Sequence, residues 1–128
     1  MGFSDAIRSC LSRYVGFSGR APRSEYWYWV LFSFLVSIAA SVLDASLLAD
    51  FALGDEETVG LAEILVTLAL ALPGTAVTVR RLHDIGRSGW WLLLIFVPIL
   101  GWIALLIWTL AKSDADANRF GPPYTAQR

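Results

Sequence analysis

The chain has 128 residues, a length that predicts one domain, and 56% of them are hydrophobic whereas only 16% are charged. In soluble domains about a quarter of all residues are charged, so this composition excludes an ordinary soluble protein and indicates a membrane protein. The net charge is −1, and the single cysteine and single histidine exclude an internal disulfide and a zinc-type ligand set, so we expect no metal.

The first predicted element is a short amphipathic helix over residues 3–14. Its apolar side chains recur at helical spacing, and Arg8 and Arg13 lie on the opposite face. Such a helix can rest in the headgroup layer of a membrane or pack on the protein's own helices, and the sequence leaves both positions open. Cys10 belongs to the apolar face, which favours a small buried side chain over a lipidated or reactive thiol.

Residues 26–43 form the first predicted transmembrane helix, after a break at two glycines and Pro22 within residues 16–23. The run is long enough to cross about 30 Å of hydrocarbon. The aromatic residues at its start are typical of interface anchors, and we assign that role to Trp27 and Trp29. Small side chains then recur every fourth residue, which favours close helix packing over a polar pathway; they are Ser33, Ser37 and Ser41.

The second predicted transmembrane helix covers residues 61–79 and follows an acidic connection, residues 44–60. Residues 44–63 together hold six Asp or Glu and no Lys or Arg, with Glu63 near the outer end of the span. Pro73 leaves the carbonyl of Ala69 without its helical partner and predicts a kink. We expect this break to serve helix packing rather than to line a ligand cavity.

The third predicted transmembrane helix covers residues 90–111, and residues 112–128 form a polar tail. Trp90 and Trp91 are expected to anchor the start of this span at the membrane interface. Pro98 and Gly101 lie in its middle, and this break leaves open a re-entrant hairpin in place of a complete crossing.

The signs of the charges predict the topology. Residues 1–25 carry four Arg and residues 80–87 carry three. The positive-inside rule places both segments on the cytoplasmic side and residues 44–60 outside. Three complete crossings then place the tail outside as well. If the third segment is re-entrant, it returns to the cytoplasmic side, and the tail is not placed outside.

The chemically densest stretch is Arg80 to Trp91, which contains the only histidine. If the second helix continues past Val79, four charged or titratable side chains share one face of it: Arg80, His83, Asp84 and Arg87. Asp84 can then pair with Arg80 and Arg87. Ser88 is then placed to cap the third helix.

Two interpretations of this stretch remain open. The first is a positive-inside determinant in which an acid neutralises part of the charge and tryptophans anchor the interface. The second is a site for an anionic headgroup or phosphate, because guanidinium groups bind oxygens in pairs and a histidine adds a titratable donor. The residues of this site are Arg80, Arg81, His83, Asp84 and Arg87, together with Arg20 and Arg23 from the first arginine-rich segment.

Catalytic motifs are not supported. Residues 16–19 read GFSG and match the GxSG of intramembrane serine proteases, with His83 as a nominal base. Ser18, however, precedes the first span, and three spans cannot enclose the water-lined site that such a protease needs. We therefore predict no catalytic residues, no cofactor and no nucleic-acid partner.

Three blocks of the sequence resemble a known family. They are GFSGRAPRSEYW at residues 16–27, RRLHDIGRSGWW at residues 80–91, and NRFGP at residues 118–122. The sequence is similar to the family called domain of unknown function 805, small bacterial inner-membrane proteins of the YhaH type. The resemblance implies a helical inner-membrane protein and no particular activity. The tail departs from the family pattern, since Asp114, Asp116 and Pro122–Pro123 stand where the family usually has other residues.

The sequence thus predicts an all-α integral membrane protein with an amphipathic N-terminal helix and three transmembrane helices. We expect it to associate with itself or with a partner membrane protein, because three helices leave the small-residue faces little to pack against. The predicted function is a non-enzymatic scaffold or accessory subunit that contacts partner helices and anionic phospholipid headgroups. A small oligomeric transporter or channel is the alternative, weakened by the lack of an ionisable residue near the middle of any span.

Overall fold

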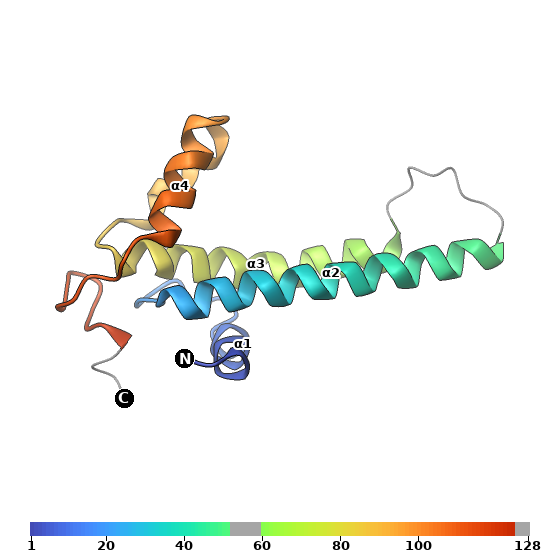
Figure 1. The fold of residues 1–128 in the computed structure, drawn as a ribbon, viewed down its shortest axis with the longest axis horizontal. Coiled ribbons are helices and arrows are strands. Elements are labelled where there is room, and N and C mark those ends of the chain that lie inside the picture. The colour runs from blue at the N-terminus through green and yellow to red at the C-terminus, as the bar shows by residue number, and fades with distance from the viewer. Residues whose placement is uncertain (52–59, 125–128) are drawn as a thin grey trace.

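The structure is a computed structural model that describes residues 1–51 and 60–124. The elements run in the order α1 (Phe3–Ser12), α2 (Arg23–Phe51), α3 (Leu61–Asp84), the 3-10 helix η1 (Gly89–Phe96) and α4 (Leu100–Leu110). Figure 1 shows α2 and α3 side by side as a long antiparallel pair, with α1 across one face and the segment that contains α4 projecting from the pair. The predicted all-α fold is confirmed.

Helices α2 and α3 have the length and composition of transmembrane helices. They contain 29 and 24 residues, and even the shorter one is about 36 Å long, more than the roughly 30 Å of a bilayer's hydrocarbon core. Only 11% and 17% of their most apolar stretches are buried inside the protein. A core helix of a soluble protein would be mostly buried, so these exposed apolar faces suit lipid.

Helix α1 has the amphipathic character predicted for residues 3–14 and ends at Ser12. Its side chains Ala6 and Cys10 are buried. Cys10 belongs to the small hydrophobic core that α1 shares with Trp29 of α2 and Val77 of α3. Of the two positions left open for this helix, the structure therefore shows packing on the protein's own helices.

Both long helices extend beyond the predicted spans 26–43 and 61–79. Helix α2 gains a polar first turn that begins at Arg23, and α3 continues through Pro73 as far as Asp84. The carbonyl that Pro73 frees is that of Ala69, and it accepts a hydrogen bond from the hydroxyl of Tyr14. The partner from the loop after α1 satisfies a group that would otherwise be buried in hydrocarbon without a donor.

At one end of the pair, which we call the acidic end, Asp44 of α2 caps the start of α3. Its two carboxylate oxygens accept the backbone N–H groups of Ala62 and Glu63, each at 2.9 Å. Gly60 is required beside this cap, because a Cβ there would lie 2.0 Å from the Asp44 carboxylate. Most of the acidic connection, residues 52–59, lies outside the described residues.

Residues 90–111 correct the prediction of a third crossing helix. They form a hairpin in which η1 leads away from the pair, the chain turns at Pro98 and Ile99, and α4 leads back. Ile99 has φ 67°, and Pro98 has no N–H to continue a helix. Gly101 allows the two halves to meet, since a Cβ there would lie 1.9 Å from the carbonyl oxygen of Leu94. We call residues 89–110 the apolar arm.

The turn of the apolar arm satisfies its own backbone. The indole N–H of Trp102 donates to the carbonyl of Ile95 at 2.8 Å, and the N–H of Gly101 donates to Val97. Helix α4 has only 11 residues, about 16 Å, which is too short to cross a membrane. Because the arm returns to its starting point, the tail lies at the same end of the pair as Arg80. This arrangement matches the hairpin that the break at Pro98 and Gly101 left open.

Candidate functional site: a buried ionic cluster

Five charged side chains gather where α2 begins and α3 ends, which we call the charged end. All are at least 95% buried, a rare state for charged residues unless they are paired. The loop before α2 supplies Arg20, the first turn of α2 supplies Glu25, and the last turn of α3 supplies the other three. These five residues form what we call the buried ionic cluster: Arg20, Glu25, Arg80, Arg81 and Asp84.

Glu25 is the partner of Arg80. The Nη1 of Arg80 donates to Glu25 Oε1 at 2.5 Å, and the same oxygen accepts from the hydroxyl of Ser9 at 3.0 Å and the thiol of Cys10 at 3.6 Å. Burial and the negative charge of Glu25 raise the pKa of Cys10 to about 12. The thiol is therefore neutral and unreactive at physiological pH, as expected for a small buried side chain.

Asp84 is the partner of Arg20 and Arg81. Its Oδ1 accepts from Arg20 Nε at 2.9 Å, and its Oδ2 accepts from Arg81 Nη1 and the hydroxyl of Ser113. The predicted pairs of Asp84 with Arg80 and Arg87 do not form. Helix α3 ends at Asp84, and Gly86 follows with φ 76°, so helical spacing does not extend to Arg87.

Arg20 ties the C-terminal tail to the cluster. Its Nη1 donates to the carbonyls of Asp116 at 2.9 Å and Gly121 at 3.2 Å. Its Nη2 donates to the carbonyls of Asp114 at 2.7 Å and Asp84 at 3.1 Å. With the bond to the Asp84 carboxylate, one guanidinium group makes five hydrogen bonds, which is the full donor capacity of an arginine.

His83 holds a second contact between the loop and the tail. Its Nδ1 lies 2.9 Å from the carbonyl oxygen of Gly19, and its ring stacks on Phe120 with centroids 3.9 Å apart. The side-chain amide of Asn118 donates to the backbone carbonyl of His83 at 2.9 Å. The histidine thus joins three segments of the chain, with one ring face against Phe120 and its Nδ1 against the Gly19 carbonyl.

Cationic and indole donors at the charged end satisfy the last carbonyls of α4. Thr109 accepts from Arg81 Nε and from the indole of Trp27, both at 3.2 Å, and Leu110 accepts from Arg23 Nη1 at 3.3 Å. Arg81 also donates to Ala111. These carbonyls have no partner within the helix and carry the negative end of its dipole, so positive side chains stabilise them.

The structure changes the role of the residues predicted to bind a headgroup. Arg20, Arg80 and Arg81 face inward and pair within the protein, so they cannot contact a phosphate at the membrane surface. Arg23 is exposed. Arg87 is half-buried with its guanidinium carbon 4.1 Å from the ring centroid of Trp108, a cation–π contact.

The four predicted tryptophan anchors have three different environments. Trp27 is half-buried, and its indole donates to the Thr109 carbonyl. Trp90 and Trp91 are exposed on the apolar arm, where an interface anchor is expected. Trp29 is buried in the core between α1, α2 and α3, which corrects its assignment as an anchor. The first turns of α2 form an inward face that α1 covers, which is the packing alternative left open for residues 3–14.

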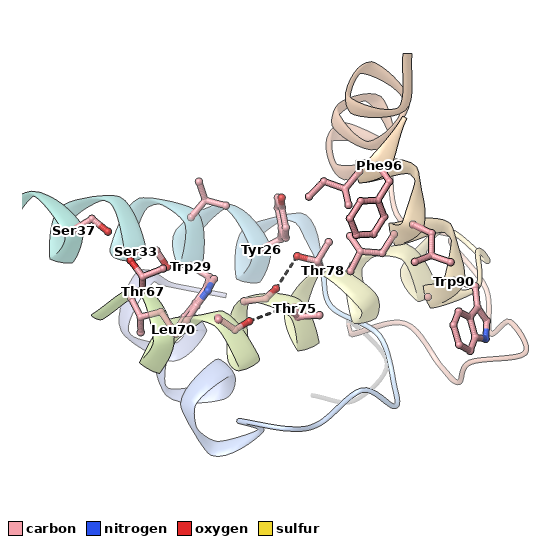
Figure 2. Close-up of a pocket in the computed structure, with 17 residues that line it drawn as sticks. Tyr26, Trp29, Ser33, Ser37, Thr67, Leu70, Thr75, Thr78, Trp90 and Phe96 are labelled. Atoms are coloured by element: carbon pink, nitrogen blue, oxygen red, sulfur yellow. Dashed lines mark hydrogen bonds between the residues drawn. The ribbon is translucent and has the colours of Figure 1, made fainter. Parts of the chain in front are cut away.

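A groove lies between α2, α3 and η1, with a volume of about 790 Å³. Figure 2 shows the hydroxyls of Ser33, Ser37 and Thr67 along one part of it, and Trp90 and Phe96 of η1 at the other. The predicted serine stripe is thus split, since Ser41 instead donates to Glu63 near the acidic end. The oxygen of Ser33 is buried, and among the described residues it has no hydrogen-bond partner.

Sequence reasoning missed several residues of the site, and they share one property: their partners are distant in the sequence. Their only signal was that some belong to the blocks of family resemblance. They are Ser9, Glu25, Ser113, Asn118 and Phe120.

The charged groups of this site pair with one another, and two carboxylates face three arginines. Each carboxylate of the cluster accepts from an arginine, and the described residues contain no group of His, Cys, Asp and Glu that could hold a metal ion. Two exposed apolar helices joined at one end by such a cluster define a small helical membrane protein.

The chain belongs to the family "Protein of unknown function (DUF805)", whose sequence model matches residues 14–122. It is 42% identical over 113 residues to the inner membrane protein YhaI of Escherichia coli K12, covering 88% of this chain and 89% of that protein. It is 38% identical over 112 residues to the inner membrane protein YhaH of the same strain, with the same coverage. The uncharacterised protein YiiR of that strain is 34% identical over 90 residues, which cover 70% of this chain and 53% of YiiR. No solved structure matches the chain.

Proposed function

We propose that this protein is a non-enzymatic scaffold or accessory subunit of the bacterial inner membrane. One observation carries the proposal: the charged residues of the buried ionic cluster, from residues 16–27 and 80–91, pair with each other and with the backbone of the same chain. Groups used in this way hold the loop, the arm and the tail in place and leave no free acid, base or nucleophile in the cluster.

In this proposal the charged end faces the cytoplasm and the acidic end faces outward. The positive-inside rule supports this orientation, because the arginine-rich segments before α2 and at the end of α3 lie together at one end. The tail is bound to the same end through Arg20 and is cytoplasmic in this arrangement.

In this proposal the exposed cationic residues around the cluster, and not its buried arginines, contact anionic phospholipid headgroups. Near an anionic leaflet each such residue contributes about 1 kcal/mol of attraction. The exposed cationic residues of the described chain at this end are Arg8, Arg13, Arg23, Lys112 and Arg119.

A lipid measurement tests this assignment. We expect the triple variant Arg13→Gln, Lys112→Gln, Arg119→Gln to retain less anionic phospholipid than the parent when both are purified in the same mild detergent. A variant with Arg87→Gln alone is the control, since Arg87 lies over the Trp108 ring. Unchanged anionic lipid in the triple variant with intact folding would remove headgroup binding from the proposal.

A small oligomeric transporter or channel is the alternative, and the groove with its hydroxyl groups is the observation in its favour. Reconstitution in vesicles separates the two. A scaffold shows no specific flux across a panel of small solutes, whereas a flux that Ser37→Ala or Pro73→Ala abolishes would replace the scaffold with the transporter.

A further inference from the structure

The apolar arm has almost no cover within its own chain. Trp90, Phe96 and Leu100 are each more than 70% exposed, and in its two helices only Gly101 and Thr109 are buried. Figure 1 shows the arm projecting steeply from the α2 and α3 pair. Its side chains therefore face either lipid or another protein.

The backbone of the arm favours a protein. Helix η1 is a 3-10 helix of eight residues, longer than the three or four that such helices usually reach, and Ile99 at the turn has φ 67°. Irregular backbone at membrane depth is tolerated where protein covers it and is not found facing lipid. The arm of the isolated chain does not meet this condition.

The groove offers a surface on which an apolar segment can pack closely. Small side chains of α2 and α3 line it, including Ser33, Ala71 and Thr75. Such residues let a neighbouring backbone approach, and they are the usual contact residues of helices in membranes.

The area of the arm is sufficient for a stable dimer. It carries more than ten large apolar side chains that are about half exposed or more. Most of these side chains are Leu or Ile, so we take about 150 Å² for each, the lower end of the range for a buried aromatic side chain. With each about half exposed or more, their exposed surface is on the order of 1,000 Å². A standard interface buries about 800 Å² from each partner, so covering most of the arm meets that requirement.

We propose that the arm of one copy packs into the groove of a second copy of this chain. Two copies in one membrane share the same orientation, so the axis that relates them runs along the membrane normal and joins residues of equal depth. The arm leaves from the charged end and therefore meets the half of the groove nearest that end, where Thr75 lies. This inference goes beyond the proposed function: it takes up the self-association expected from the sequence, and it names the partner and the contact.

Cross-linking between two differently tagged copies tests the contact. Both copies carry Cys10→Ser, so that the introduced cysteines are the reactive ones. One copy carries Leu100→Cys at the tip of the arm, and the other carries Thr75→Cys in the groove. In the control pair, Leu31→Cys replaces Thr75→Cys. Leu31 is exposed, does not line the groove, and lies about two turns from the charged end, as Thr75 does.

We expect mild oxidation of native membranes to link the Leu100→Cys and Thr75→Cys copies at least fivefold more than the control pair. Equal linkage of the two pairs, or preference for Leu31→Cys, overturns the inference. The mass of the Cys10→Ser parent in nanodiscs is measured in parallel. A monomer there overturns self-association as a whole, whereas a dimer without the specific link overturns only the contact between arm and groove.

Discussion

Replacing Asp84 with Asn is the sharpest test of the buried ionic cluster. The substitution preserves the shape of the side chain and one carbonyl acceptor, and it removes the negative charge. In the native protein that charge faces Arg20 and Arg81, whose side chains are fully buried. After the change the cluster contains three arginines and Glu25 as its one carboxylate.

The expected loss of stability follows from this imbalance. Removing one member of a buried ion pair typically costs about 3–5 kcal/mol, because the remaining charge stays away from water without compensation. Asp84 serves two arginines and the hydroxyl of Ser113, so we expect a value in the upper half of that range. A protein of this kind is stable by about 5–15 kcal/mol, so the effect is large.

The assay is reversible unfolding by SDS in dodecyl maltoside micelles, followed by tryptophan fluorescence. Asp116→Asn is the matched control, because Asp116 is exposed and contacts Arg20 through its backbone carbonyl; we expect a change within about 0.5 kcal/mol. A loss of less than about 1 kcal/mol for Asp84→Asn would refute the view that the cluster supports the fold.

Three further predictions concern other contacts. Gly60→Ala should cost about 1–2 kcal/mol in the same assay, because a Cβ there displaces the Asp44 cap; Gly2→Ala, where the nearest atom is 3.6 Å away, should cost less than half as much. With its pKa raised from 9.0 to about 12, Cys10 should react with N-ethylmaleimide at pH 8 at least tenfold more slowly in the folded protein than in the unfolded one, as measured by mass spectrometry. Since the unfolded thiol ionises first, the contribution of Cys10 to stability is complete below pH 9 and falls between pH 9 and 12. Phe120→Ala removes the ring that stacks on His83, so trypsin should cleave after Arg119 several-fold faster; an unchanged cleavage rate would show that the stack does not hold the tail.

The sequence was sufficient to predict the two long helices. Their apolar runs and the polar segments around them predict both spans, and Pro73 correctly indicated that the carbonyl of Ala69 needs another partner. The sequence did not reveal that this partner is Tyr14, since the contact depends on where α1 lies. The hydropathy pattern also missed the polar first turn of α2, because Arg23 and Glu25 are polar residues whose partners, Leu110 and Arg80, are distant in the sequence.

The apolar arm shows a limit of hydropathy. A continuous apolar run of this length satisfies the criterion for a crossing helix whether the chain continues or turns back. Pro98 and Gly101 indicated a break, but the turn is decided by a close contact: the Leu94 carbonyl approaches the position where Gly101 lacks a side chain. A contact between two specific backbone atoms leaves no periodic signal in the sequence.

The pairing of Asp84 shows a second limit. Helical spacing predicted pairs of Asp84 with Arg80 and Arg87, whereas Asp84 pairs with Arg81 of the same helix and with Arg20 from a distant loop. Arg20 is 64 residues away in the sequence, and it binds Asp84 because the loop before α2 passes the end of α3, where Ala21 donates its N–H to the carbonyl of Arg80 at 2.9 Å.

The three blocks that carry the family resemblance meet at this one place. The first supplies Arg20 and the Gly19 carbonyl, the second supplies His83 and Asp84, and the third supplies Phe120 and the Gly121 carbonyl. Each block therefore satisfies polar groups or covers a ring of the other two. A buried site in which two carboxylates hold three arginines is sensitive to any single replacement. The chemical character of these segments is thus explained by the contacts among them, and the apolar arm and the groove are the surfaces that we propose for a second copy.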